Sequence, residues 1–174
     1  SPPIQSADIT IQLPIFNERN VVEQLLASIC ALRWSQGNLE IQILDDSTDE
    51  TQAILQHLTQ EYRAQGIEIE YIHRTDRTGY KAGALANGLK TATGKFIAIF
   101  DADFTPRPDF LERLMGHLND EKIGMVQARW EHQNREQNLL TKLTSILLDG
   151  HFVIEHTTRH RSGRFFNFNG TAGI

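Results

Sequence analysis

The sequence predicts an α/β fold built on a Rossmann-like, mostly parallel sheet with helices on both faces. Apolar, β-rich segments alternate along the chain with segments of helical periodicity, which is typical of βαβ units. The run KFIAIFDAD (95–103) is almost continuously apolar before its aspartates, as expected of a strand buried on both faces. Polar clusters follow four of the expected strands. Because the carboxyl ends of parallel strands share one edge of a sheet, we expect a ligand site there.

The elements follow from periodicity and from the residues at their ends. The expected strands cover 9–16, 39–46, 67–74, 95–103 and 124–133, and the expected helices cover 20–34, 47–65, 79–92, 108–118 and 137–154. Two helices begin with the spacing of a capping box, Asn20 with Glu23 and Ser47 with Glu50. Pro108 suits a first helical turn, where a missing N–H costs nothing.

Length and composition favour one domain over residues 1–174, since 40% of the residues are hydrophobic. The net charge of −5 argues against a nucleic-acid partner, which usually needs a basic face. The chain has no apolar run long enough to span a membrane, so by itself it is expected to be soluble. The apolar and glycine-rich end FFNFNGTAGI predicts that the chain is truncated at its C-terminus.

Asp101 and Asp103 are the first candidate site residues. An unpartnered buried carboxylate is costly, so aspartates that end a buried strand are either exposed or bound to a cation. The sequence has no G-x-G-x-x-G after its first strand and no Walker A loop to hold phosphates. Carboxylate oxygens suit Mg²⁺ or Mn²⁺, and residues i and i+2 of a strand point to the same side. The alternative is a pair of solvated turn carboxylates.

Charged residues also follow the second and third strands. Asp45 and Asp46 end the second strand and Arg74 ends the third, while Lys81 lies at the start of the next helix. These residues place two carboxylates and two cations at the edge where a ligand is expected. Alternatively, Asp45 and Asp46 are a carboxylate pair favoured by the N-terminus of the next helix. Lys81 and Arg74 could likewise be ordinary solvent-exposed cations.

Five ordered segments carry a family resemblance. LPIFNE, ILDDSTDET, GYKAGALANGL, FDADFTPRPDFL and FNFNGTAG resemble the inverting glycosyltransferases of family 2, which have the GT-A fold. The resemblance is closest to the cellulose-synthase-like mannan and glucomannan synthases, and it covers residues 9–174. It implies transfer of a sugar, with glucose or mannose favoured, from a UDP- or GDP-sugar to a glycan or lipid acceptor with Mn²⁺ or Mg²⁺.

The resemblance also implies roles for individual residues. Substrate-binding positions of the family match Pro14, Asn17, Glu18, Asp45, Asp46, Lys81, Asp101, Asn169, Gly170 and Thr171. Arg74 is a further substrate-binding candidate, as a cation available at the same edge. Asp101 and Asp103 match the metal and diphosphate motif and are the catalytic candidates within the chain. The last three substrate positions match an acceptor-side wall, although FFNFNGTAG could also be a simple buried strand and turn.

The family's general base lies downstream of FNGTAG, so the resemblance implies that it is outside this chain. Residues 1–174 alone are therefore expected not to catalyse steady sugar transfer. It also implies a membrane-associated full-length protein, held by parts outside this chain, with its catalytic domain on the cytoplasmic side. One alternative is a sugar-phosphate nucleotidyltransferase, but PIFNERN (14–20) lacks the glycine-rich loop of that class. Another is a non-catalytic nucleotide-binding domain.

Overall fold

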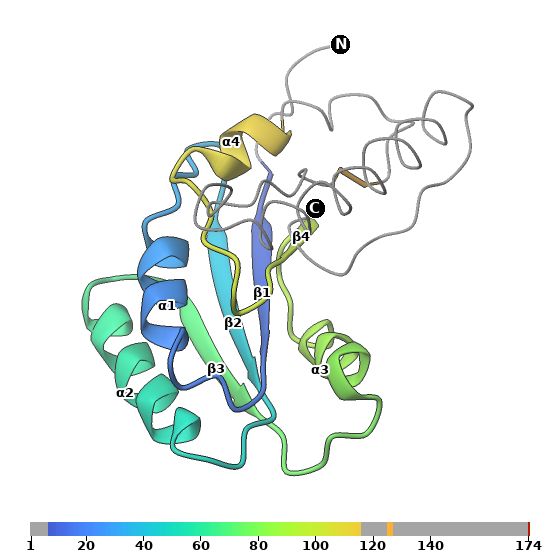
Figure 1. Cartoon of the computed structure of the whole chain (residues 1–174). Coiled ribbons are helices and arrows are strands. Elements are labelled where there is room, and N and C mark those ends of the chain that lie inside the picture. Colours follow the sequence, from blue (N-terminus) through green and yellow to red (C-terminus); the bar gives the residue numbers. More distant parts are fainter. Residues whose placement is uncertain (1–6, 116–124, 127–173) are drawn as a thin grey trace, which may run out of the picture. The chain divides into compact units, whose positions relative to one another are not determined.

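A computed structural model of the chain describes residues 7–115, 125–126 and 174. The described residues alternate strand and helix throughout, which confirms the α/β prediction (Figure 1). The strands are β1 (Ile9–Ile15), β2 (Leu39–Asp45), β3 (Ile69–His73) and β4 (Phe96–Ile99). The helices are α1 (Val22–Cys30), α2 (Thr51–Ala64), α3 (Tyr80–Gly88) and α4 (Phe110–Met115).

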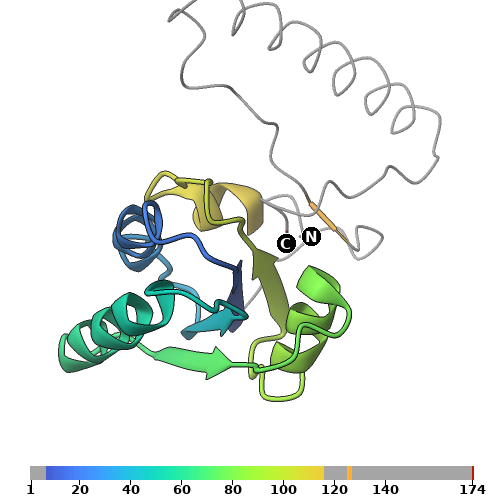
Figure 2. The same ribbon diagram turned by 60° about the horizontal axis from the view of Figure 1, so that its bottom comes forward.

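The four strands form one parallel sheet in the order β3-β2-β1-β4. Ile15 of β1 pairs with Asp45 of β2, and Asp45 pairs with His73 of β3, so these three strands end at the same level. Helices α1 and α2 lie on one face of the sheet and α3 lies on the other (Figure 2). The expected arrangement of helices on both faces is therefore confirmed.

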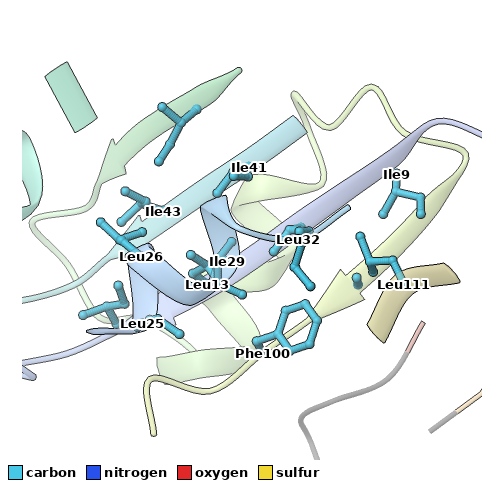
Figure 3. Packing of buried hydrophobic residues seen from close by; sticks show 14 of the residues in the cluster. Ile9, Leu13, Leu25, Leu26, Ile29, Leu32, Ile41, Ile43, Phe100 and Leu111 are labelled. Atoms are coloured by element: carbon cyan, nitrogen blue, oxygen red, sulfur yellow. The ribbon is translucent and has the colours of Figure 1, made fainter. Parts of the chain in front are cut away.

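The face of the sheet toward α1 carries the hydrophobic core. Alternate residues of the strands point to it, and α1 contributes residues at helical spacing (Figure 3). Phe100 and Leu111 extend the core past β4 to α4, and both are fully buried. The core cluster in Figure 3 includes Ile9, Leu13, Leu25, Leu26, Ile29, Leu32, Ile41 and Ile43.

The opposite face of β1 and β2 is polar and nevertheless buried, with α3 packed close to both strands. Gln12 Nε2 donates to Gln42 Oε1 at 3.0 Å. Thr10 Oγ1 donates to Glu40 Oε2 at 2.5 Å, and the same oxygen accepts bonds from the backbone N–H and hydroxyl of Thr93 at 2.9 and 2.8 Å. Buried polar groups need such partners, so this layer specifies how the strands meet the loop before β4.

The first expected capping box is wrong. Helix α1 begins at Val22, and Val21 at its N-cap makes no side-chain hydrogen bond, so Asn20 and Glu23 do not cap it. The turn is closed instead by backbone N–H groups of Val21 and Val22, which donate to the Glu18 carbonyl at 3.0 and 3.2 Å.

The second expected capping box is also wrong, because α2 begins only at Thr51. Ser47 Oγ accepts a bond from the Asn17 backbone N–H at 2.8 Å, and the Glu50 side chain pairs with Arg19. Both residues of the expected box therefore connect the loop after β2 to the loop after β1. Pro108, likewise, precedes α4 and is not in its first turn.

The expected strand at 124–133 and helix at 137–154 lie outside the described residues, except for Met125 and Val126. Val126 and Ile174 exchange two backbone hydrogen bonds, at 2.8 and 2.9 Å. Within the described ranges, none of the helices has the length and apolar character needed to cross a bilayer.

The Glu40 network predicts a pH-dependent stability. Burial acts to raise the pKa of Glu40, but hydrogen bonds from Thr10 and Thr93 outweigh it and lower the pKa below 4.5. A depressed folded-state pKa stabilises the protein above the unfolded value and stops doing so as the pH falls through the folded value. At pH 7, Glu40→Gln should lower the free energy of unfolding by about 1–3 kcal/mol.

Denaturant unfolding at several pH values measures this effect, with the exposed Glu68→Gln as the control. The deficit of Glu40→Gln should shrink as the pH falls below 4.5 and should be lost once the pH has passed through the lower folded-state pKa, where the folded carboxyl also loses its charge. An equal deficit at pH 7 and pH 3 would show that the charge of Glu40 is not what stabilises the layer.

Candidate functional site

The carboxyl edge of the sheet brings together the polar clusters of three strands. Beyond the ladder, the Asp46 N–H donates to the Ile15 carbonyl at 2.9 Å, and the Arg74 N–H donates to the Asp45 carbonyl at 3.0 Å. Parallel pairing therefore continues one residue past the strands. The segments 14–18, 45–48 and 73–74 lie side by side as a consequence.

Asp45 is completely buried and accepts hydrogen bonds from three directions. Oδ1 accepts the Ser47 N–H at 2.9 Å, while Oδ2 lies 2.7 Å from the Tyr71 hydroxyl and 3.2 Å from His73 Nδ1. Burial, reinforced by the bond to Asp45, raises the pKa of Tyr71, so Tyr71 remains a donor at neutral pH. The carboxylate is held in one orientation by neighbours on β3 as well as its own loop.

Asp46 is almost as deeply buried and forms a two-point ion pair with Arg74. Arg74 Nε donates to Asp46 Oδ1 at 2.8 Å and Nη2 donates to Oδ2 at 2.5 Å. The hydrogen bond with Asp46 raises the pKa of Arg74 further above its usual value. The remaining N–H groups of Arg74 reach the carbonyls of Thr78 at 3.2 Å and Tyr80 at 3.1 Å. Asp46 and Arg74, both expected at the site, are thus brought together and bound to each other.

Asn17 connects the loops after β1 and β2. Its φ of 55° is left-handed, a conformation that asparagine tolerates better than most residues. Its Oδ1 accepts the Thr48 N–H at 2.8 Å, and its own N–H donates to Ser47 Oγ. Pro14 lies within β1, and the neighbouring Glu18 is exposed at the same edge.

Arg77 lies between two aromatic rings at this edge. Its guanidinium carbon is 3.3 Å from the centroid of the Phe16 ring and 5.3 Å from that of Tyr80. Arginine over an aromatic face is favourable, and it links the first loop to the segment before α3. The Tyr80 side chain is 68% exposed and marks the start of α3.

Lys81 forms an ion pair with Asp101, which links α3 to the segment after β4. Strand β4 ends at Ile99, earlier than expected, and the Phe104 N–H closes a turn on the Asp101 carbonyl at 3.0 Å. Asp101 and Asp103 therefore lie in a turn and not in a strand, so the rule that strand residues i and i+2 point to the same side does not apply to them. Asp101 is partly exposed and Asp103 is exposed.

The donor chemistry of this turn suits a hard divalent cation. Mg²⁺ and Mn²⁺ are commonly held by one or two carboxylates, with water and substrate phosphates completing the coordination. Asp101 and Asp103 supply two such carboxylates next to a lysine that already pairs with one of them. In the part of the chain that the structure describes, no cluster of three or more Asp, Glu, His or Cys side chains could hold a metal alone.

Three expected site residues, Asn169, Gly170 and Thr171, lie outside the described residues. Sequence reasoning missed Tyr71 and His73 as partners of Asp45, and Arg77 as the residue stacked on Phe16. The available signal was the register of β3, since its alternate residues 71 and 73 lie beside 43 and 45 of β2.

Sequence comparison shows the family. The model of Glycosyl transferase family 2 matches residues 10–172. The described parallel sheet has the carboxyl edge at which open α/β folds bind their ligands. The chain belongs to glycosyl transferase family 2.

Several plant proteins are similar to this chain over almost its whole length. It is 44% identical over 171 residues to glucomannan 4-beta-mannosyltransferase 2 of Arabidopsis thaliana, which covers 95% of this chain and 32% of that protein. Identity to glucomannan 4-beta-mannosyltransferase 1 of Oryza sativa subsp. japonica is 40%, covering 95% and 33%. The chain thus spans about a third of the length of the curated relatives it matches.

Several solved structures share the fold. The mannosyltransferase PcManGT from Pyrobaculum calidifontis, solved with GDP-Man and Mn²⁺, has a TM-score of 0.65 and 27% identity, covering 75% of this chain and 39% of that one. S. aureus TarS, solved with UDP, has a TM-score of 0.58 at 19% identity, covering 75% and 40%. The expected GT-A fold is therefore confirmed.

Removal of the Tyr71 hydroxyl tests how Asp45 is held. Tyr71→Phe leaves one oxygen of a fully buried carboxylate without its shortest hydrogen bond. The free energy of unfolding should fall by about 1–3 kcal/mol, as expected when a buried acceptor loses a donor. Denaturant unfolding measures this, with Tyr62→Phe on α2 as the matched control. Equal stabilities of the two variants would contradict the described role of Tyr71.

Proposed function

We propose that the chain is the nucleotide-sugar-binding catalytic core of an inverting glycosyltransferase that uses Mn²⁺ or Mg²⁺. The donor is a UDP- or GDP-sugar carrying mannose or glucose, and the acceptor is a glycan or glycolipid. The observation that carries the proposal is the meeting, at one edge of the sheet, of a buried carboxylate pair, Asp45 and Asp46, with the Lys81–Asp101 ion pair.

The nucleoside end of the donor is assigned to the first two strand ends. Asp45 is already held by the Ser47 N–H, the Tyr71 hydroxyl and the His73 ring, so little further ordering of its side chain is needed when a ligand binds beside it. Pro14, Asn17 and Glu18 border the same place from β1, and Asn17 fixes the loop that contains Thr48. These residues are proposed to enclose the base and ribose.

The diphosphate end is assigned to α3 and the turn after β4. Asp101 and Asp103 would hold the divalent cation, which when bound would neutralise the charge of the diphosphate. Lys81 is within reach because its ammonium group already contacts Asp101. If Lys81 exchanged its contact with Asp101 for a contact with phosphate oxygens, its positive charge would lie where the leaving group becomes more negative. This would favour the transition state over the ground state.

The relatives support the choice of donor class. The plant glucomannan 4-beta-mannosyltransferases are 40–44% identical to this chain, and PcManGT is solved with GDP-Man and Mn²⁺. A GDP-sugar with mannose is the first donor to test for that reason. We further propose that the general base lies outside residues 1–174 and that Asn169, Gly170 and Thr171 belong to the acceptor side. The full-length protein is proposed to be membrane-associated, with its catalytic domain on the cytoplasmic side.

Calorimetric titration tests the donor and metal assignments together. GDP and UDP are titrated with and without Mn²⁺ into the wild-type protein, Asp103→Ala and the control Glu61→Ala, which removes an exposed carboxylate from α2. One nucleotide should bind in a Mn²⁺-dependent manner. Because the cation is the link between the carboxylates and the diphosphate, Asp103→Ala should weaken binding by roughly tenfold or more.

Glu61→Ala should bind like the wild type. Two results would overturn the proposal: no binding of either nucleotide by the intact protein, or identical Mn²⁺-dependent affinities for the wild type and Asp103→Ala.

A further inference from the structure

We propose that Asp46 and Arg74 form a positioning clamp that sets the first turn of α3 and thereby the place of Lys81 at the diphosphate. This inference rests on the proposed function only in naming the diphosphate. The clamp acts through Lys81, so neither member needs to contact the nucleoside.

The anchor of the clamp is Asp46, whose backbone is bonded to β1 and whose side chain is 4% exposed. Both of its carboxylate oxygens are occupied by Arg74, in the planar two-point geometry that arginine makes with carboxylates. A lysine has one ammonium group and cannot reproduce that geometry. Arg74 is therefore fixed to the end of β2.

The other side of the guanidinium holds the start of α3. Nη1 donates to the Thr78 carbonyl and Nη2 to the Tyr80 carbonyl, one on each side of Gly79. Gly79 and Tyr80 are both left-handed, with φ of 74° and 49°. A tyrosine adopts that conformation only where its surroundings impose it, and the bond from Arg74 is such a constraint.

Gly83 closes the same turn. A Cβ on Gly83 would lie 2.0 Å from the Thr78 carbonyl oxygen and 2.9 Å from Arg74 Nη1. The backbone of α3 thus approaches the Arg74 guanidinium as closely as a glycine allows.

Lys81 follows Tyr80 directly, so the clamp determines where its side chain starts. The Lys81 side chain is 38% exposed and has a flexible four-carbon stem, so burial alone does not fix its ammonium group. A fixed position of the Lys81 backbone keeps the ammonium group near Asp101. Loss of the clamp should therefore reduce the contribution of Lys81 to diphosphate binding while the nucleoside part of the site is retained.

The test measures the affinity of the intact protein, with Mn²⁺ present, for two ligands. One is the nucleoside diphosphate that binds the wild type, and the other is the corresponding nucleoside. Arg74→Gln should weaken binding of the diphosphate by about tenfold and change binding of the nucleoside by less than about twofold, because only the diphosphate depends on Lys81. Asp46→Asn is a second variant with a milder change. Arg74→Lys should not restore the wild-type affinity for the diphosphate. Arg113→Gln, which removes an arginine from an exposed ion pair with Asp109, is the matched control.

A double-mutant cycle decides whether the effect runs through Lys81. In the Lys81→Ala background, Arg74→Gln should cost little further affinity for the diphosphate, since residues that act as a unit are not additive. Additive losses, or an equal loss of affinity for the nucleoside, would overturn the proposal.

Amide hydrogen exchange without nucleotide separates this proposal from the proposed function. Peptides covering residues 79–84 should exchange faster in Arg74→Gln and Asp46→Asn than in the wild type and Arg113→Gln. Unchanged exchange there would contradict the clamp even if the nucleotide binds. If no nucleotide binds the wild type, the proposed function fails, and the exchange result alone decides whether the clamp exists.

Discussion

Two adjacent carboxylates buried at the end of β2 are the constraint on which the site depends. A buried carboxylate is tolerated only with charged or hydrogen-bonding partners, and Asp45 and Asp46 have none within their own strand. The sheet order provides them, because β2 lies between β1 and β3. Tyr71 and His73 of β3 hold Asp45, and Arg74 holds Asp46. The loops at this edge are organised around satisfying those two groups.

The same constraint extends across the sheet to the turn after β4. Arg74 binds Asp46 on one side and the backbone before α3 on the other, and α3 carries Lys81 to Asp101. A chain of contacts therefore connects the second, third and fourth strand ends. The Asp46–Arg74 and Lys81–Asp101 pairs are partly buried, where electrostatic interactions are stronger than in water, whereas the bonds from Arg74 to the Thr78 and Tyr80 carbonyls are exposed. These charges are therefore held in a fixed arrangement at the edge of the sheet where the donor is proposed to bind.

The fold, and which residues gather at the carboxyl edge of the sheet, could be predicted from the sequence more fully than how those residues pair. Alternation of strands and helices identifies the sheet, and its parallel order places 45, 46, 74 and 101 near one edge. Local sequence could not show that Ser47 bonds to Asn17 instead of capping α2, because the partner is 30 residues away. The Arg74–Asp46 pair likewise depends on the register between β2 and β3. The early end of β4 was missed because Asp101 and Phe104 form a turn that apolar periodicity does not reveal.

The proposed function requires that Asp101, Asp103 and Lys81 hold the metal and diphosphate of a nucleotide sugar. A crystal structure of the protein with GDP and Mn²⁺, or with UDP if that nucleotide binds, tests it most directly through the anomalous signal of manganese. The account predicts a manganese ion bound to Asp101 and Asp103, with the Lys81 ammonium group at a phosphate oxygen. A manganese ion bound elsewhere, or a diphosphate without contact to Lys81, would contradict it.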